Sequence, residues 1–355
     1  MKNVKNLTKR LWQIPEIRGI GSLGFLRYAT KALALGRILL ITQWFSPAEM
    51  GVYGVALLIL AIAEVTTETG VNVILLKHPE KLKNYIHTAW LVSLLRGGLI
   101  AIAIVLLIQP LTHFFETPSL PGLLLWCALV AAMKGVINPA VISFQQNLEF
   151  GKETLYRSPL QILDLASGLF FAWWWQDVAG LIVGLLVAAV VEVVTSFWIF
   201  SLRPNIRLAR WQQLAQLYKE TRTIIVNGIV QYFTEHSDDI LIGRLLGPAA
   251  LGIYQTAYKL VSAVTFDLAS IIGQALYPIY AARVDQPVLL RKTFTQSTAI
   301  FYLLMIPVSL VVLIFPRELT SLLLGEEWAL VGTILPLMFL LTCLRKFKIK
   351  IRRKR

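Results

Sequence analysis

Residues Asp238 to Lys259, with the sequence DDILIGRLLGPAALGIYQTAYK, decide the fold of this chain. An apolar segment runs into Gly247-Pro248, and a second apolar segment begins immediately after that pair. Glycine and proline together break helices and favour tight corners. The stretch therefore predicts two antiparallel helices joined by a very short turn.

Nearly the same corner occurs once earlier in the chain. An offset of 201 residues places Pro47 on Pro248, and the segment 40–56 then matches the later corner at seven positions. A repeat of this length in an apolar chain predicts two similar helical bundles and not a solenoid. The matching residues of the earlier corner are Leu40, Ile41, Pro47, Ala48, Gly51, Tyr53 and Ala56.

The composition is that of a polytopic membrane protein. Hydrophobic residues make up 56% of the 355 residues and charged residues 15%, whereas soluble domains have about 25% charged residues. The net charge of +14 comes from basic residues between apolar runs, which favours a membrane surface over nucleic acid as the partner. The two cysteines and four histidines have no disulfide or metal-ligand spacing, so we expect no metal and no cofactor.

The apolar segments predict ten membrane spans, each of which needs about 20 residues. These spans predict an all-α protein with a first lobe at 1–201 and a partial second lobe at 223–344. Residues 202–222 have apolar positions at helical spacing and predict an amphipathic linker on the cytoplasmic membrane surface, and 345–355 form a basic cytoplasmic tail. The ten spans are 22–45, 51–76, 86–109, 121–146, 156–175, 178–201, 223–246, 250–279, 294–316 and 327–344.

The distribution of basic residues predicts the orientation. Loops on one side of the predicted spans hold 26 lysines and arginines, Arg157 among them, and the opposite loops hold Arg317. Basic loops remain in the cytoplasm, so we expect both termini to be cytoplasmic. The two repeats then have the same orientation, related by a pseudo-twofold axis along the membrane normal.

Two motifs carry a family resemblance. Asp238 to Lys259 reads D-x-x-x-I-G-R-x-L-G-P-x-x-L-G-x-Y-x-x-A-Y-K, and Gly325 to Trp328 reads G-x-x-W. With these motifs the chain resembles, over nearly its whole length, the polysaccharide transporters of the MOP superfamily. These include the Wzx-type oligosaccharide flippases, with lipid II flippases and MATE exporters as more distant relatives.

The resemblance implies two pseudo-symmetric helical lobes of the MOP/MATE type. The family has more spans in its second lobe than the four predicted here, and span ten runs directly into the basic residues 345–355. We therefore expect an incomplete second lobe. We also expect residues 1–355 to insert into the membrane and to transport poorly by themselves.

Charged residues inside the predicted spans are the candidate site. Each one costs roughly 2.5–3.5 kcal/mol at the bilayer centre, so such residues should face a wet cavity or one another. Arg27 and Lys31 share one helix face, as do Glu64 and Glu68 on the next span, and the two pairs could instead form internal salt bridges. We expect four cations to line the cavity and bind an anionic headgroup: Arg27, Lys31, Lys134 and Lys259.

A second candidate site lies on predicted span seven. Glu235, Asp238 and Asp239, beside His236, could carry protons or bind Na⁺. The alternative is that the two aspartates lie at the outer interface and are simply solvated. Arg37 and Arg244 lie near helix ends, where we expect them to extend toward water.

The resemblance implies transport of a polyprenyl diphosphate oligosaccharide across the bacterial cytoplasmic membrane, in surface polysaccharide biosynthesis such as that of lipopolysaccharide. Alternating access would move it without covalent chemistry, so we do not expect an enzyme. Expected partners are membrane lipids and, in the same process, a polysaccharide polymerase and glycosyltransferases. The alternatives are a MATE-like exporter of small molecules and a truncated remnant without transport. A net basic cavity would favour the flippase, and a net acidic one the exporter.

Overall fold

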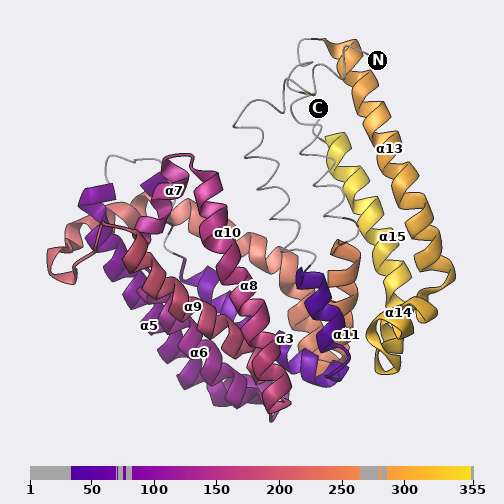
Figure 1. Cartoon of the computed structure of the whole chain (residues 1–355), viewed down its shortest axis with the longest axis horizontal. Coiled ribbons are helices and arrows are strands. Elements are labelled where there is room, and N and C mark those ends of the chain that lie inside the picture. The colour runs from indigo at the N-terminus through magenta and orange to yellow at the C-terminus, as the bar shows by residue number, and fades with distance from the viewer. Residues whose placement is uncertain are drawn as a thin grey trace. The chain divides into compact units, whose positions relative to one another are not determined.

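The computed structural model describes residues 33–68, 70, 75–76, 82–263, 265, 280 and 286–352. These residues form helices and turns, with no strand among them, which confirms the predicted all-α fold. Contacts divide the chain into two compact units (Figure 1). The first comprises Met1–Arg37 and Val52–Pro248, and the second comprises Ile38–Gly51 and Ala249–Arg355.

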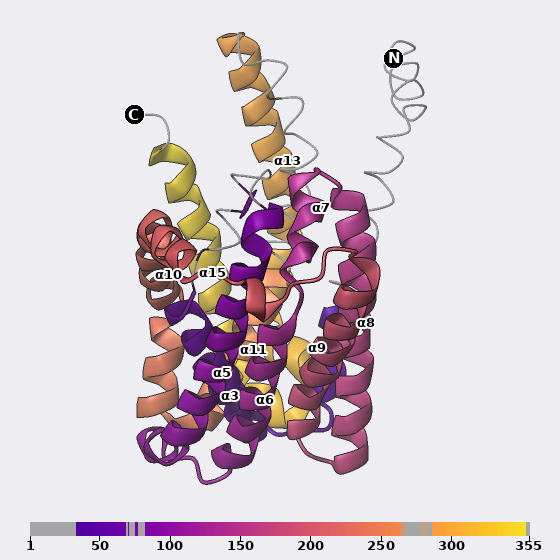
Figure 2. The same ribbon diagram turned by 90° about the vertical axis from the view of Figure 1, so that its left-hand side faces the viewer.

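The first unit is built around four helices. In Figures 1 and 2, α5 and α6 lie side by side, as do α8 and α9, and α6 also contacts α9. A β-carbon on Gly97 of α5 would lie 2.8 Å from Cα of Gly135 on α6, so only glycine allows this close crossing. The helices of this unit are α3 (Pro47–Thr66), which begins in the second unit, α5 (Leu82–Phe115), α6 (Leu120–Val136), α7 (Ser143–Gln146), α8 (Phe150–Trp175), α9 (Ala179–Ile199) and α10 (Trp211–Leu245).

The predicted span over 121–146 is bent and is not one straight helix. Helix α6 ends at Val136, and the chain continues as η2 (Pro139–Ile142) and α7 at an angle of 69° to α6. Pro139 has no N–H to donate and disfavours a helical conformation at Asn138. The helix therefore breaks at Ile137-Asn138.

One helix joins two elements that were predicted to be separate. It contains residues 211–222 of the predicted linker and most of the predicted span 223–246. Helix α10 runs without interruption over 35 residues, preceded by the 3-10 turn η3 (Ile206–Leu208). The position of residues 202–222 on the membrane surface stays a prediction, as do the lobe boundaries.

The second unit contains part of each copy of the repeated corner, up to Gly51 in the earlier copy and from Ala249 in the later one. Gly247 has a φ of +83°, which favours glycine, and it separates α10 from α11 (Gly247–Ser262), as predicted. A β-carbon on Gly252 would overlap the carbonyl oxygen of Pro47 and lie 2.9 Å from the backbone nitrogen of Gly51. Gly51 and Gly252 are equivalent in the repeat, so the two corners pack against each other through matching residues.

The G-x-x-W element, Gly325 to Trp328, packs against the earlier corner of the repeat. Trp328 is fully buried, and its Nε1 donates to the carbonyl oxygen of Thr42 at 2.9 Å. Gln43 donates to the carbonyl oxygen of Leu323 from the same corner. The remaining helices of this unit are α13 (Pro287–Ile314), α14 (Pro316–Leu324), η5 (Glu326–Trp328) and α15 (Ala329–Arg352).

Several helices are suited to a membrane. Four in the described part of the chain are long and apolar enough to cross it, and the bent pair around Asn138 makes a fifth if it counts as one span. Helices α8 and α10 were also predicted as spans, but polar side chains interrupt their apolar sequences. The four are α3, α9, α13 and residues 85–115 of α5.

Candidate functional site

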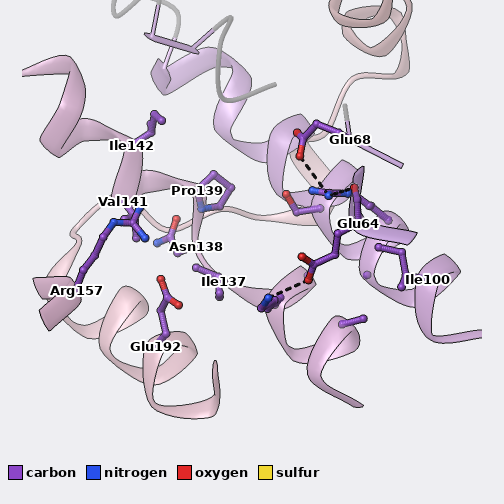
Figure 3. A pocket seen from close by; sticks show the side chains of 16 residues that line it. Glu64, Glu68, Ile100, Ile137, Asn138, Pro139, Val141, Ile142, Arg157 and Glu192 are labelled. Carbon is purple, nitrogen blue, oxygen red and sulfur yellow. Dashed lines mark hydrogen bonds and ion pairs between the residues drawn. The ribbon is translucent and has the colours of Figure 1, made fainter. Parts of the chain in front are cut away.

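A cavity of about 340 Å³ lies within the first unit. Figure 3 shows that the break at Ile137, Asn138 and Pro139 forms one of its walls. Helices α3, α5, α6, α8 and α9 supply the other lining residues. Its charged lining residues in the described chain are Glu64, Glu68, Arg96, Lys134, Arg157 and Glu192.

Hydrogen bonds from Asn138 stabilise the break beside this cavity. Its side-chain oxygen accepts from the N–H of Ala140 at 3.0 Å, and its side-chain nitrogen donates to the carbonyl oxygen of Leu202 at 2.9 Å. Its own N–H donates to the Ser196 hydroxyl at 3.1 Å. Broken helices at membrane depth typically line the polar cavities of transporters. The break therefore opens a polar region among apolar helices.

Two ion pairs cross the cavity wall from α3. Nζ of Lys134 lies 2.9 Å from Glu64, and Nη2 of Arg96 lies 3.2 Å from Glu68. Glu68 also accepts a hydrogen bond from the backbone N–H of Gly70 at 3.2 Å. Arg27 and Lys31, the partners proposed in the alternative prediction, lie outside the described residues.

Arg96 is held more firmly than Lys134. Besides Glu68, its guanidinium donates to the carbonyl oxygen of Glu64 at 2.6 Å and to the Thr67 hydroxyl at 3.2 Å. These contacts satisfy the carboxyl end of α3, where the helix dipole favours a cation. Lys134 contacts Glu64 alone among the contacts described for it, and its side chain is 45% exposed.

Arg157 brings a third cation to the cavity. We counted it with the cytoplasmic loops, but it lies within α8 and lines the cavity. Its Nε donates to Glu153 at 2.9 Å, and Gln145 donates to the same carboxylate oxygen at 2.7 Å. The two Nη atoms make no hydrogen bond within the described residues. In Figure 3, Arg157 and Glu192 come from different helices and point into the same side of the cavity.

The described lining is balanced in charge, with three cations and three carboxylates. Net cavity charge therefore does not separate a flippase from an exporter in this unit. Two cations of the lining can exchange partners. The half-exposed Lys134 side chain and the Nη atoms of Arg157 face the open space of the cavity.

A second cavity of about 350 Å³ lies between α3, α5 and α10 of the same unit. Glu64, Glu68 and Arg96 line both cavities, so these three residues form a shared wall. On the α10 side the second cavity is lined by Gln231 and Glu235, among other residues.

The predicted ion-coupling residues lie at two places on α10: Glu235 beside the second cavity, and Asp238 with Asp239, whose N–H donates to Asp238 Oδ1 at 3.1 Å. Glu235 accepts a hydrogen bond from Gln231 at 3.1 Å beside the second cavity. Asp239 is buried and pairs with His236 at 3.0 Å, whereas Asp238 is exposed. The solvated alternative therefore suits Asp238 and is wrong for Asp239.

Lys259 is not among the described lining residues of the first cavity. It lies on α11 in the second unit and is half-buried. Its role in anion binding stays a prediction.

The prediction that Arg37 extends toward water is wrong. Its side chain is 12% exposed and pairs with Asp164 of α8 at 3.4 Å. The other guanidinium nitrogen, Nη2, and the other carboxylate oxygen, Oδ1, are buried without a hydrogen bond. Arg244 does lie at an exposed helix end, where it pairs with Glu116 and stacks over Phe114.

Sequence reasoning missed the position of Arg157 at the cavity and the broken helix. The dipeptide Asn138-Pro139 signals the break, since an Asn-Pro pair favours the start of a turn. Arg157 gives no such signal, because a cation near a predicted helix end looks like any loop cation. Its position becomes clear only once α8 is seen to begin at Phe150.

Apolar helices around a charged internal cavity define a multi-pass helical membrane protein. The chain belongs to the polysaccharide biosynthesis protein family, whose family model matches residues 40–331. It has the fold of a multidrug resistance MATE family transporter of the MOP superfamily in its inward-facing conformation. That likeness has a TM-score of 0.54 and 13% identity, over 88% of this chain and 78% of the transporter.

Two curated relatives support the same family. Lipopolysaccharide biosynthesis protein WzxC of Escherichia coli is 21% identical over 88% of this chain and 64% of its own length. The probable low-salt glycan biosynthesis flippase Agl15 of Haloferax volcanii is 20% identical over 71% of this chain and 52% of its length. The chain thus spans less than two thirds of these relatives. The predicted resemblance is confirmed for the polysaccharide biosynthesis family and for a MATE-type fold.

Proposed function

We propose that the chain acts in moving a polyprenyl-linked oligosaccharide across the bacterial cytoplasmic membrane, by alternating access. The observation that carries this proposal is the cavity of the first unit, where Lys134 and Arg157 face open space among apolar helices. A diphosphate needs cations of this kind, while its lipid tail needs a surrounding bilayer. Family membership and a relative named as a flippase support the same reading.

The physics of the membrane agrees with export of an anion. An inside-negative potential favours outward movement of each negative charge by about 2.3 kcal/mol per 100 mV. With both termini in the cytoplasm, as the loop charges indicate, the cations of the cavity would meet the substrate before it crosses. No bond is made or broken in such a cycle, so we propose a transporter and not an enzyme. A polymerase and glycosyltransferases are the proposed partners in the same process.

A MATE-like exporter is the second candidate. The MATE-type fold and the three carboxylates of the cavity favour it, since carboxylates suit a cationic cargo. The two candidates differ in which cavity charge they need. A flippase needs Lys134, whereas an exporter of cations needs the carboxylates.

Complementation of a flippase-deficient strain tests the proposal, with this chain extended by the last spans of a full-length relative, because residues 1–355 are expected to transport poorly by themselves. We expect Lys134→Ala and Lys259→Ala each to lower polysaccharide export at unchanged protein level. Lys152→Ala is the matched control, because Lys152 is 67% exposed and pairs with Glu149 away from the cavity. Normal export by both the Lys134→Ala and the Lys259→Ala variant would exclude the anion site. Export of a small cationic molecule that is lost when Glu64 and Glu192 are neutralised would favour the exporter.

A further inference from the structure

Glu64 occupies a position that the transport proposal does not explain. Its carboxylate pairs with Lys134 in the first cavity, and the same residue also lines the second cavity beside α10. A glutamate side chain can turn from one cavity to the other by changing between staggered rotamers. Its backbone need not move, since Arg96 holds the carbonyl oxygen of Glu64 at 2.6 Å.

We propose that Glu64 is an internal competitor that a bound anion displaces from Lys134, and that the displaced carboxylate then turns toward α10. This inference rests on the proposed function, because the anion is the diphosphate group of the cargo. In the empty state Glu64 neutralises Lys134. In the loaded state the anion takes Lys134 and Arg157, and Glu64 enters the second cavity.

The second cavity can receive the displaced carboxylate. Gln231 of α10 lines it, and its side-chain amide has two N–H groups, of which one donates to Glu235 at 3.1 Å. The other N–H can donate a hydrogen bond to a carboxylate. Tyr232, also on α10, lines the same cavity.

The change of partner by Glu64 would couple the binding of cargo in the first cavity to helix α10. This helix ends at Leu245, directly before the corner that leads into α11. A ligand shifts a conformational equilibrium only by contacts that differ between two states. Here the differing contact is the Glu64 carboxylate, with Lys134 in one state and with α10 in the other.

Glu68 provides the matched comparison. It also lines both cavities, but its partner Arg96 has two further contacts, to Glu64 in α3 and to Thr67 directly after α3. Arg96 therefore stays in place whether or not Glu68 is charged. Of the two glutamates, Glu64 alone pairs with the half-exposed Lys134.

The test uses the whole chain in lipid nanodiscs, with inorganic pyrophosphate as the probe. Both native cysteines are replaced by alanine, and Gly228→Cys carries a polarity-sensitive fluorophore. Gly228 lines the second cavity, and a β-carbon there meets nothing within 4 Å. We expect pyrophosphate to bind and to change the fluorophore emission.

Glu64→Gln should bind pyrophosphate about three- to fivefold more tightly, because a partly exposed ion pair contributes up to about 1 kcal/mol. It should also abolish the change in emission, since no carboxylate arrives beside Gly228. Glu68→Gln should tighten binding by a smaller factor than Glu64→Gln, because it removes a cavity charge but not the partner of Lys134, and it should keep the emission change. Glu64→Asp, a milder variant that keeps the charge, should tighten binding by a smaller factor and serves if Glu64→Gln does not fold.

The outcomes separate the two proposals. If the unmodified chain does not bind pyrophosphate, or if Lys134→Gln binds it equally well, the anion site is wrong and this inference is overturned with it. If Lys134→Gln loses binding but Glu64→Gln binds no more tightly than the unmodified chain, the competitor role alone is overturned. Emission that still changes in Glu64→Gln has the same consequence.

Discussion

Two ion pairs of the first unit have the same chemistry and opposite surroundings. Arg37 and Asp164 are 12% and 20% exposed, whereas Lys134 and Glu64 are 45% and 30% exposed. A buried charge that loses its partner has no water to replace it, while a half-exposed charge does. The first pair should therefore stabilise the bundle, and the second should be free to exchange. Four predictions test this difference.

The largest effect is expected at Arg37. Arg37→Met leaves Asp164 buried without a cation, which should lower the free energy of unfolding by about 3–5 kcal/mol. Thermal unfolding of the purified protein in detergent measures this loss. The double variant Arg37→Met with Asp164→Leu should recover most of it, because no charge remains buried. A single variant as stable as the unmodified protein would show that this pair is not structural.

Asn138 should come next, because it is a buried polar residue without charge. Asn138→Ala removes the side-chain contacts to Ala140 and Leu202 and should cost about 1–3 kcal/mol. The same unfolding measurement applies, with Asn147→Ala at the end of α7 as the control. If Asn138→Ala leaves stability unchanged, Pro139 by itself maintains the break.

The sequence predicted much of the fold but little of the charge pairing. Helix positions follow from local apolar runs, and the corner at Gly247 follows from two adjacent residues, so both could be read directly. The partner of Arg37 could not be predicted, because Asp164 is 127 residues away in the sequence. The distance between the two side chains depends on how α8 packs. Lys134 was found as a cavity cation, but its pairing with Glu64 depends on the closeness of α3 and α6. The Asn138-Pro139 break was readable and was missed because the apolar run continues across it.

A smaller effect is expected at Arg96, which lies between the two extremes. Its side chain is 25% exposed, but its three contacts tie down the end of α3. Arg96→Gln should cost about 1–2 kcal/mol, the range found for lost helix caps and charged hydrogen bonds. Hydrogen exchange should speed up at residues 62–66 and remain unchanged in α9. Uniform acceleration across the unit would indicate a global loss of packing and not the loss of a cap.

The smallest effect on stability is expected at Lys134, where the effect on function should be largest. Lys134→Gln should change the free energy of unfolding by about 0–1 kcal/mol, because its pair with Glu64 is half-exposed and screened by salt. At 1 M salt the Debye length is about 3 Å, so the ion pair is screened. The free energy of unfolding that the unmodified protein loses there should be no larger than the loss caused by Lys134→Gln. Export in the complementation assay should nevertheless fall. If Lys134→Gln instead destabilises the protein as much as Arg37→Met does, the two pairs are alike, and Lys134 is a structural residue that no anion can take from Glu64.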